Sequence, residues 1–175
     1  MRIDTFTAET NDWAKIAAEA QRAEALGVDG YAIPEIQGDP LLNAAMAAQA
    51  TERVRVGTGI VVAFPRSPMV LAVQAWAIHR NSGGRFALGM GTQIKAHNER
   101  RFSTPWKAPR SRIVEYVESL RAIWRCWELG ERLNYEGKYY QFSLMTPEFT
   151  PPKSNLPMVP IYLAAVRPRP IESAA

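Results

Sequence analysis

Short apolar runs rich in β-branched residues alternate along this chain with longer stretches of helical period. This alternation is typical of βα units wound around a parallel sheet. We predict strands at residues 2–6, 28–33, 54–62, 86–91 and 161–165. We predict helices at about 11–26, 40–50, 67–81 and 110–127. The sequence therefore predicts an α/β protein built on a parallel sheet.

The ends of these elements carry turn and capping signals. Asp39 is followed by Pro40, and Ser67 by Pro68, which is the pattern of an N-cap followed by a proline in the first helical turn. Between the last predicted helix and the last strand, residues 133–142 read as a hairpin turning at Glu136 and Gly137. We therefore expect the hairpin to lie outside the parallel sheet.

Two architectures suit this order of elements, namely an open doubly wound sheet and part of a closed (β/α)8 barrel, which normally needs about 250 residues. A dinucleotide-binding fold should carry G-x-G-x-x-G after its first strand, but residues 7–10 contain no glycine. Glycines lie instead toward the carboxyl ends of the third and fourth strands, where barrel enzymes build their sites. We predict an incomplete barrel of about five βα units, in a single domain spanning residues 1–175.

Composition excludes several classes of protein. Of the 175 residues, 47% are hydrophobic and 22% are charged, which is usual for a globular protein. The chain has no apolar run of about 20 residues and no apolar stretch at its N-terminus, so we expect a cytoplasmic protein that does not bind membranes. One cysteine and two histidines cannot form a zinc cluster, and we expect no metal. The net charge of +4 is scattered, so we expect no nucleic-acid partner.

Three ordered blocks resemble a known family: GTGIVVAFPRSPMVLAVQAW, SGGRFALGMGTQIKAHNERRF and YEGKYY. They are similar to the bacterial luciferase-like superfamily, in particular its coenzyme F420-dependent oxidoreductase branch, from Met1 to about Val166. The resemblance implies a flavin- or deazaflavin-dependent (β/α)8 barrel, often dimeric, that transfers a hydride or activates oxygen at its carboxyl-terminal mouth. It covers about the first five-eighths of such a barrel.

The resemblance also implies cofactor-binding residues. Many family members have a cis non-proline peptide that supports the cofactor ring, and this bond falls at Gly59 and Ile60. Gly91, Thr92 and Gln93 resemble the family's contacts to the cofactor after the fourth strand. From the residues alone, Gly59 also suits an ordinary glycine in a tightly packed strand.

Two residues are candidates for acid–base chemistry. His97 lies where a ring-contacting polar residue is common in the family, although its polar neighbours also suit a surface histidine. Many deazaflavin members carry an Asp-His pair after the second strand, and these positions are Glu35 and Ile36 here. The carboxylate is kept and the histidine is lost. A lone glutamate in a loop is also commonly just solvated.

Two functions remain open. The first is an oxidoreductase that uses coenzyme F420, or alternatively FMN, to act on a small molecule. We expect weak or absent activity from this chain, because the last three βα units of the family have no counterpart in it. The second is a non-catalytic half-barrel module that self-associates or binds a partner. In either case we expect a homo-oligomer, with free sheet edges and with partly exposed interior side chains, which we predict to be Ile3, Val56, Leu88 and Ile161.

Overall fold

The computed structural model describes residues 2–165, which group into two compact units interleaved along the chain. The first unit holds the described residues up to 62, with 74–91 and 159–164. The second unit holds residues 63–73 and 92–158 and, as the last described residue, Ala165. The expected single domain over residues 1–175 stays a prediction.

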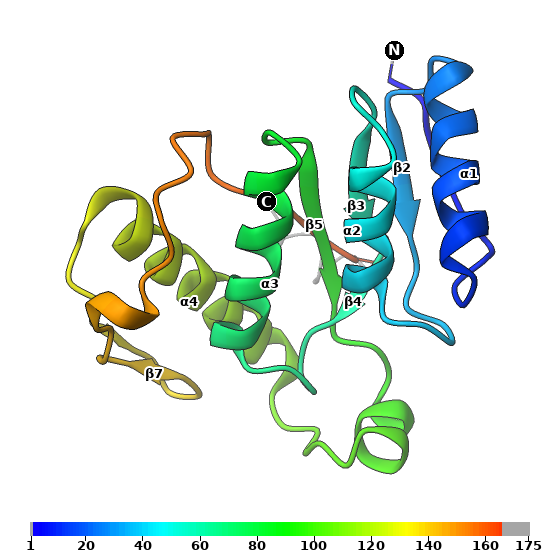
Figure 1. Ribbon diagram of the computed structural model, residues 1–175. Coiled ribbons are helices and arrows are strands. Elements are labelled where there is room, and N and C mark those ends of the chain that lie inside the picture. Colours follow the sequence, from blue (N-terminus) through cyan, green and yellow to red (C-terminus); the bar gives the residue numbers. More distant parts are fainter. Residues whose placement is uncertain (1, 166–175) are drawn as a thin grey trace. The chain divides into compact units, whose positions relative to one another are not determined.

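The first unit is built on a parallel sheet (Figure 1). Its strands pair in the order β1 (Asp4–Phe6), β2 (Gly30–Ile33), β3 (Arg55–Thr58), β5 (Phe86–Gly91) and β8 (Ile161–Leu163). These five strands correspond to the five that the sequence predicts. Each successive predicted strand lies beside the one before it, which is the usual result of right-handed βα crossovers. The predicted α/β parallel sheet is confirmed.

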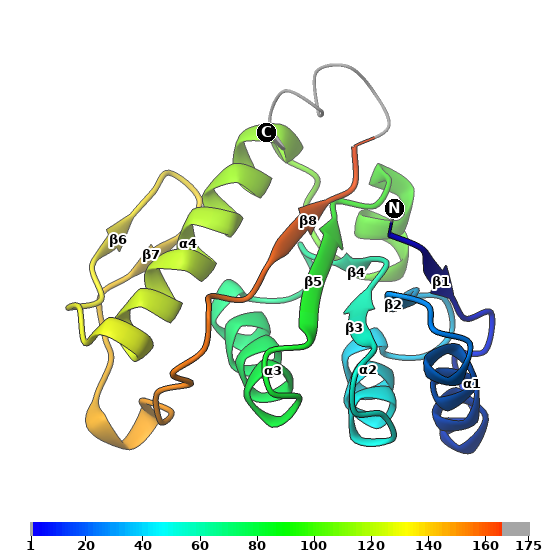
Figure 2. The same cartoon turned by 90° about the horizontal axis from the view of Figure 1, so that it is seen from above.

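Helices cover one side of this sheet (Figure 2). They are α1 (Trp13–Ala25), α2 (Pro40–Gln49) and, within the first unit, the part of α3 (Pro68–Asn81) from residue 74 onward. The predicted cap at Asp39 is confirmed, since its carboxylate accepts from the amides of Leu41 and Leu42. Satisfying these free amides fixes where α2 begins.

The opposite side of the sheet carries small or exposed side chains. Gly57 pairs with Ala87, and Gly89 pairs with Tyr162, which is 54% exposed. Val56 and Leu88 alternate with these residues and are fully buried. Our expectation that Val56 and Leu88 would be partly exposed is therefore wrong, because the two-residue period of a strand turns them toward the helix layer. Ile3 and Ile161 are partly exposed, as predicted.

The predicted third strand, residues 54–62, is interrupted. It consists of β3 and of β4 (Val61–Val62), separated by Gly59 and Ile60. The peptide bond between these two residues is cis, as the resemblance implied. β4 pairs with Met90 and Gly91 of β5. The apolar residues continue through position 64, so hydrophobic pattern alone does not reveal the break.

The second unit is organised by α4 (Pro109–Leu129), whose wide apolar face is buried as predicted. The Tyr116 hydroxyl donates to the carbonyl of Arg66 at 3.1 Å, and the Trp124 indole donates to that of Ala72 at 3.2 Å. The predicted hairpin forms a separate antiparallel pair of β6 (Tyr135–Glu136) and β7 (Gln141–Phe142). Two short helices were not predicted, the π-helix η1 (His97–Arg101) and the 3-10 helix η2 (Pro147–Phe149).

No helix within residues 2–165 is long and apolar enough to cross a membrane. In the same part of the chain, no three His, Cys, Asp or Glu side chains come together as a possible metal site.

We predict that Gly89→Ala severely destabilises the first unit. A β-carbon at this position would run into the carbonyl oxygen of Thr58, and the Thr58 hydroxyl already donates to the Gly89 carbonyl at 2.6 Å. The strands cannot separate without losing this contact, so we expect the free energy of unfolding to fall by about 3 kcal/mol. Urea denaturation followed by circular dichroism measures it.

Gly59→Ala is the matched control. The nearest neighbour of a β-carbon there is the Ala32 methyl group at 3.2 Å, which is a tight but apolar contact. We expect a loss of about 1 kcal/mol. An equal loss in the two variants would contradict the argument from close strand approach.

Candidate functional site

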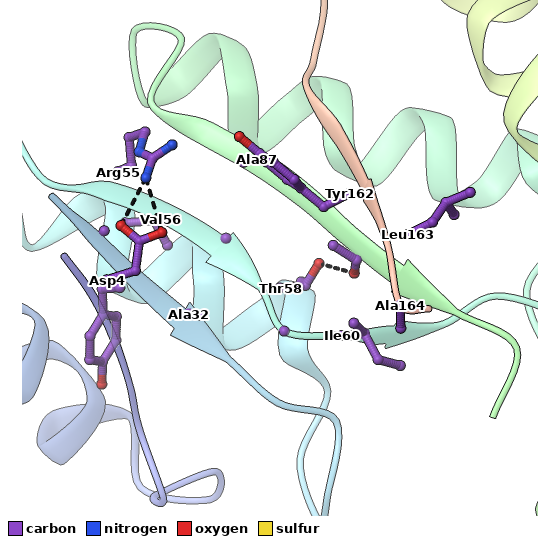
Figure 3. A pocket seen from close by; sticks show the side chains of 15 residues that line it. Asp4, Ala32, Arg55, Val56, Thr58, Ile60, Ala87, Tyr162, Leu163 and Ala164 are labelled. Carbon is purple, nitrogen blue, oxygen red and sulfur yellow. Dashed lines mark hydrogen bonds and ion pairs between the residues drawn. The ribbon is translucent and has the colours of Figure 1, made fainter. Parts of the chain in front are cut away.

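A cavity of about 270 Å³ lies on the open face of the sheet in the first unit (Figure 3). Strands β2, β3 and β5 and the β3–β4 junction contribute residues with no side chain or a single methyl group. These small residues are Gly30, Ala32, Gly57, Gly59, Ala87 and Gly89. A face of this kind lets a flat ligand approach the backbone closely, which larger side chains would prevent.

One end of the cavity carries an ion pair. Asp4 and Arg55 lie across Gly30 in the strand register, and the Arg55 guanidinium donates to both Asp4 carboxylate oxygens, at 2.8 and 3.1 Å. A β-carbon on Gly30 would lie 2.6 Å from Asp4 Oδ1, so glycine permits the bridge. The pair lies at the amino ends of the strands and is partly solvated, so it adds little stability.

The other end of the cavity brings predicted site residues together. Gly59 and Ile60 line the cavity, and a β-carbon on Gly91 would lie 3.3 Å from the Ile60 side chain. The Glu35 amide donates to the Ile60 carbonyl at 3.3 Å. The Glu35 carboxylate accepts from the Val62 amide at 2.7 Å. These residues therefore meet at the carboxyl ends of β2, β3 and β5, the edge where α/β barrels hold their sites.

The remaining predicted site residues belong to the second unit. Gln93 has a positive φ of 57°, and its side-chain oxygen accepts from the Ile94 amide. The Thr92 hydroxyl donates to the Gln93 carbonyl. His97 is exposed at the first residue of η1. Thr92, Gln93 and His97 thus all lie in the second unit, whereas Gly59, Ile60 and Gly91 lie in the first.

Asn98 fixes the conformation of this segment and was missed in the sequence. It is fully buried, and its side-chain amide donates to the carbonyls of Thr92 at 2.8 Å and of Ile94 at 3.0 Å. A buried donor shared by two loop carbonyls holds both in place. In the sequence Asn98 stands in a polar run beside His97, so nothing there separates it from a surface residue.

An arginine in the second unit is held between aromatic rings. The Arg112 guanidinium lies 4.4 Å from the Phe64 ring centre, and its Nε donates to the Tyr140 hydroxyl at 2.9 Å. Burial raises the pKa of Tyr140, and Arg112 acts in the opposite direction. The Tyr140 hydroxyl therefore remains protonated near neutral pH, and Arg112 is held in a fixed orientation.

The whole chain, residues 1–175, matches the sequence family described as luciferase-like monooxygenase. An uncharacterized protein of Mycobacterium tuberculosis is 44% identical over 156 residues, which are 89% of this chain and 46% of that protein. The chain thus spans about half the length of this curated relative.

Solved structures share the fold. An F420-dependent secondary alcohol dehydrogenase, in complex with an F420–acetone adduct, matches with a TM-score of 0.80 at 21% identity, over 99% of this chain and 55% of its own. The oxygenating constituent of 3,6-diketocamphane monooxygenase from Pseudomonas putida, in complex with FMN, matches with a TM-score of 0.77 at 17% identity, over 93% and 51%. At these identities the likeness is one of fold. The predicted incomplete (β/α)8 barrel is confirmed.

We predict that Asn98→Ala lowers the free energy of unfolding by about 1 to 2 kcal/mol, because the Thr92 and Ile94 carbonyls lose the side-chain donor, while the main-chain amide of residue 98 still donates to Ile94. The loss stays moderate because Asn98 Oδ1 is itself buried with no partner among the described residues. Urea unfolding followed by tryptophan fluorescence measures the loss. Asn81→Ala is the control, since its side-chain bond to the Ala77 carbonyl is solvent-exposed. A larger loss in Asn81→Ala than in Asn98→Ala would contradict this role.

Proposed function

The chain belongs to the luciferase-like monooxygenase family. We propose that it functions as a flavin- or deazaflavin-dependent oxidoreductase of the F420 branch. Members of this family are flavin- or F420-dependent oxidoreductases, and the chain covers about half of their homologous domains. The observation that carries the proposal is the glycine- and alanine-lined cavity, which has Gly59 and Ile60 at the carboxyl ends of the strands, with Gly91 next to the Ile60 side chain.

The residues of the first unit fit a planar ring system. Gly59 and Gly91 present no side chain, and β-carbons there would come within 3.2 Å of Ala32 and Ala164. Ile60 offers an apolar surface beside them. We assign the support of the ring to Gly59 and Ile60. From the family resemblance alone, we also assign cofactor contacts to Gly91, Thr92 and Gln93. When bound, coenzyme F420, or alternatively FMN, supplies the hydride chemistry.

We assign proton transfer with a small-molecule substrate to His97. Its imidazole is exposed, and histidine is the commonest general acid or base near neutral pH. Asn98, the next residue, is anchored to the Thr92 carbonyl, so the start of η1 is tied to the segment assigned to the cofactor.

The second candidate function is a non-catalytic half-barrel module that self-associates. It is favoured by the open sheet face, where Phe6 is 75% exposed and Tyr162 is 54% exposed. Large exposed apolar side chains on a sheet face with free edges promote association. Association as a homo-oligomer is compatible with both functions, but tight cofactor binding is expected only of the first.

We predict that the chain quenches the fluorescence of F420 or FMN in a titration, and that Gly59→Val weakens this binding by about tenfold or more. The branched side chain would fill space that the ring must occupy. Ala25→Val, at the exposed end of α1, is the control and should keep the affinity. Unchanged affinity in Gly59→Val would contradict the assignment of this position.

We predict a dimer or larger assembly in sedimentation equilibrium at micromolar concentration. Burial of apolar surface contributes about 25 cal/mol per Å², so a few hundred Å² on the open face favour association before its entropic cost. Replacing Phe6 and Tyr162 by serine should shift the protein toward the monomer. A monomeric wild type at every concentration would exclude the proposed homo-oligomer.

A further inference from the structure

Glu35 binds the chain beyond the Gly59–Ile60 peptide at two points. The amide of Gly59, the residue after β3, donates to the Ile33 carbonyl at the end of β2 at 2.8 Å. Beyond it, the Glu35 amide donates to the Ile60 carbonyl, and the Val62 amide donates to Glu35 Oε2. Main-chain pairing joins β2 to β3. The Glu35 side chain extends these contacts to β4 through its hydrogen bond with Val62.

We propose that Glu35 is a positioning residue that holds residues 60–62 in register with the end of β2. β4 is only two residues long, and Val62 within it is fully buried. Its main-chain pairing is with β5, so Glu35 secures the segment from the β2 side. Because Ile60 lines the cavity, Glu35 shapes the wall that the proposed function assigns to the cofactor ring, and this consequence rests on that function.

This role differs from acid–base chemistry in what it demands of the side chain. A positioning residue needs an oxygen that accepts from the Val62 amide, which a glutamine also provides. An acid or base needs a proton that can be exchanged, which glutamine lacks. Glu35→Gln and Glu35→Ala therefore separate the two roles.

Glu24 provides a matched control in the same unit. Its carboxylate accepts from the amides of Arg53 at 2.6 Å and Val54 at 2.8 Å, and also from that of Glu52. Like Glu35, Glu24 accepts hydrogen bonds from main-chain amides. Its partners lie just before β3, whereas the partner of the Glu35 carboxylate lies after β3. Glu24→Ala should loosen residues 52–54 and leave the Val62 amide unchanged.

The first measurement is amide hydrogen exchange by NMR on the 175-residue chain without cofactor. In Glu35→Ala we expect the Val62 amide to exchange about tenfold faster, as loss of a hydrogen bond to a charged acceptor implies. In Glu35→Gln we expect exchange within about threefold of the wild type. Val62 exchange that rises no more in Glu35→Ala than in Glu24→Ala would overturn the proposal.

The second measurement is titration with F420 and with FMN, followed by fluorescence quenching. We expect Glu35→Gln to keep the wild-type dissociation constant and Glu35→Ala to raise it about tenfold. Equal weakening in both variants would overturn the positioning role, because the charge and not the acceptor would then matter. A wild type that binds neither cofactor would overturn the proposed function, and hydrogen exchange at Val62 would still decide the role of Glu35.

Discussion

Large and small side chains alternate along β3 and β5, and this alternation determines where the core and the cavity of the first unit lie. Val56 and Leu88 are fully buried, while Gly57 and Gly89 lie on the other face of the same strands. A β-carbon on Gly57 would lie 2.8 Å from the Ala87 carbonyl, so the strands approach only because this face lacks bulk. The two-residue alternation of a strand therefore places large side chains in the core between the sheet and its helices, and small residues at the cavity on the open face.

The carboxyl ends of the strands turn this open face into a candidate site. The amino end carries the Asp4–Arg55 ion pair, in which the two opposite charges neutralise each other. At the carboxyl end, Gly59 is exposed and lines the cavity with Ile60, and Glu35 accepts a hydrogen bond from the amide of Val62 in the segment that follows. The face is thus polar and paired at one end, and flat and apolar at the other. The proposed ring-binding function draws on this asymmetry.

Sequence patterns predicted the features that depend on local chemistry. Asp39 before Pro40 marked a helix start, and the glycine-containing apolar run 86–91 marked β5. Sequence patterns were less informative where contacts between residues distant in the sequence determine the burial or the conformation of a residue. Hydrophobicity did not indicate which face of the sheet Val56 occupies, because apolar side chains suit either side of a barrel strand. The bonds from Asn98 to loop carbonyls likewise depend on a local π-helix that no periodicity predicts.

We propose that the carboxyl end of the open face binds the ring of a flavin or deazaflavin. The most direct measurement is amide hydrogen exchange of the 175-residue chain, recorded with and without saturating F420 or FMN. We predict slower exchange at residues 58–62 and 89–94, with no change around Asp4 and Gly30 at the amino end. Protection confined to the amino end, or no protection with either cofactor, would contradict it.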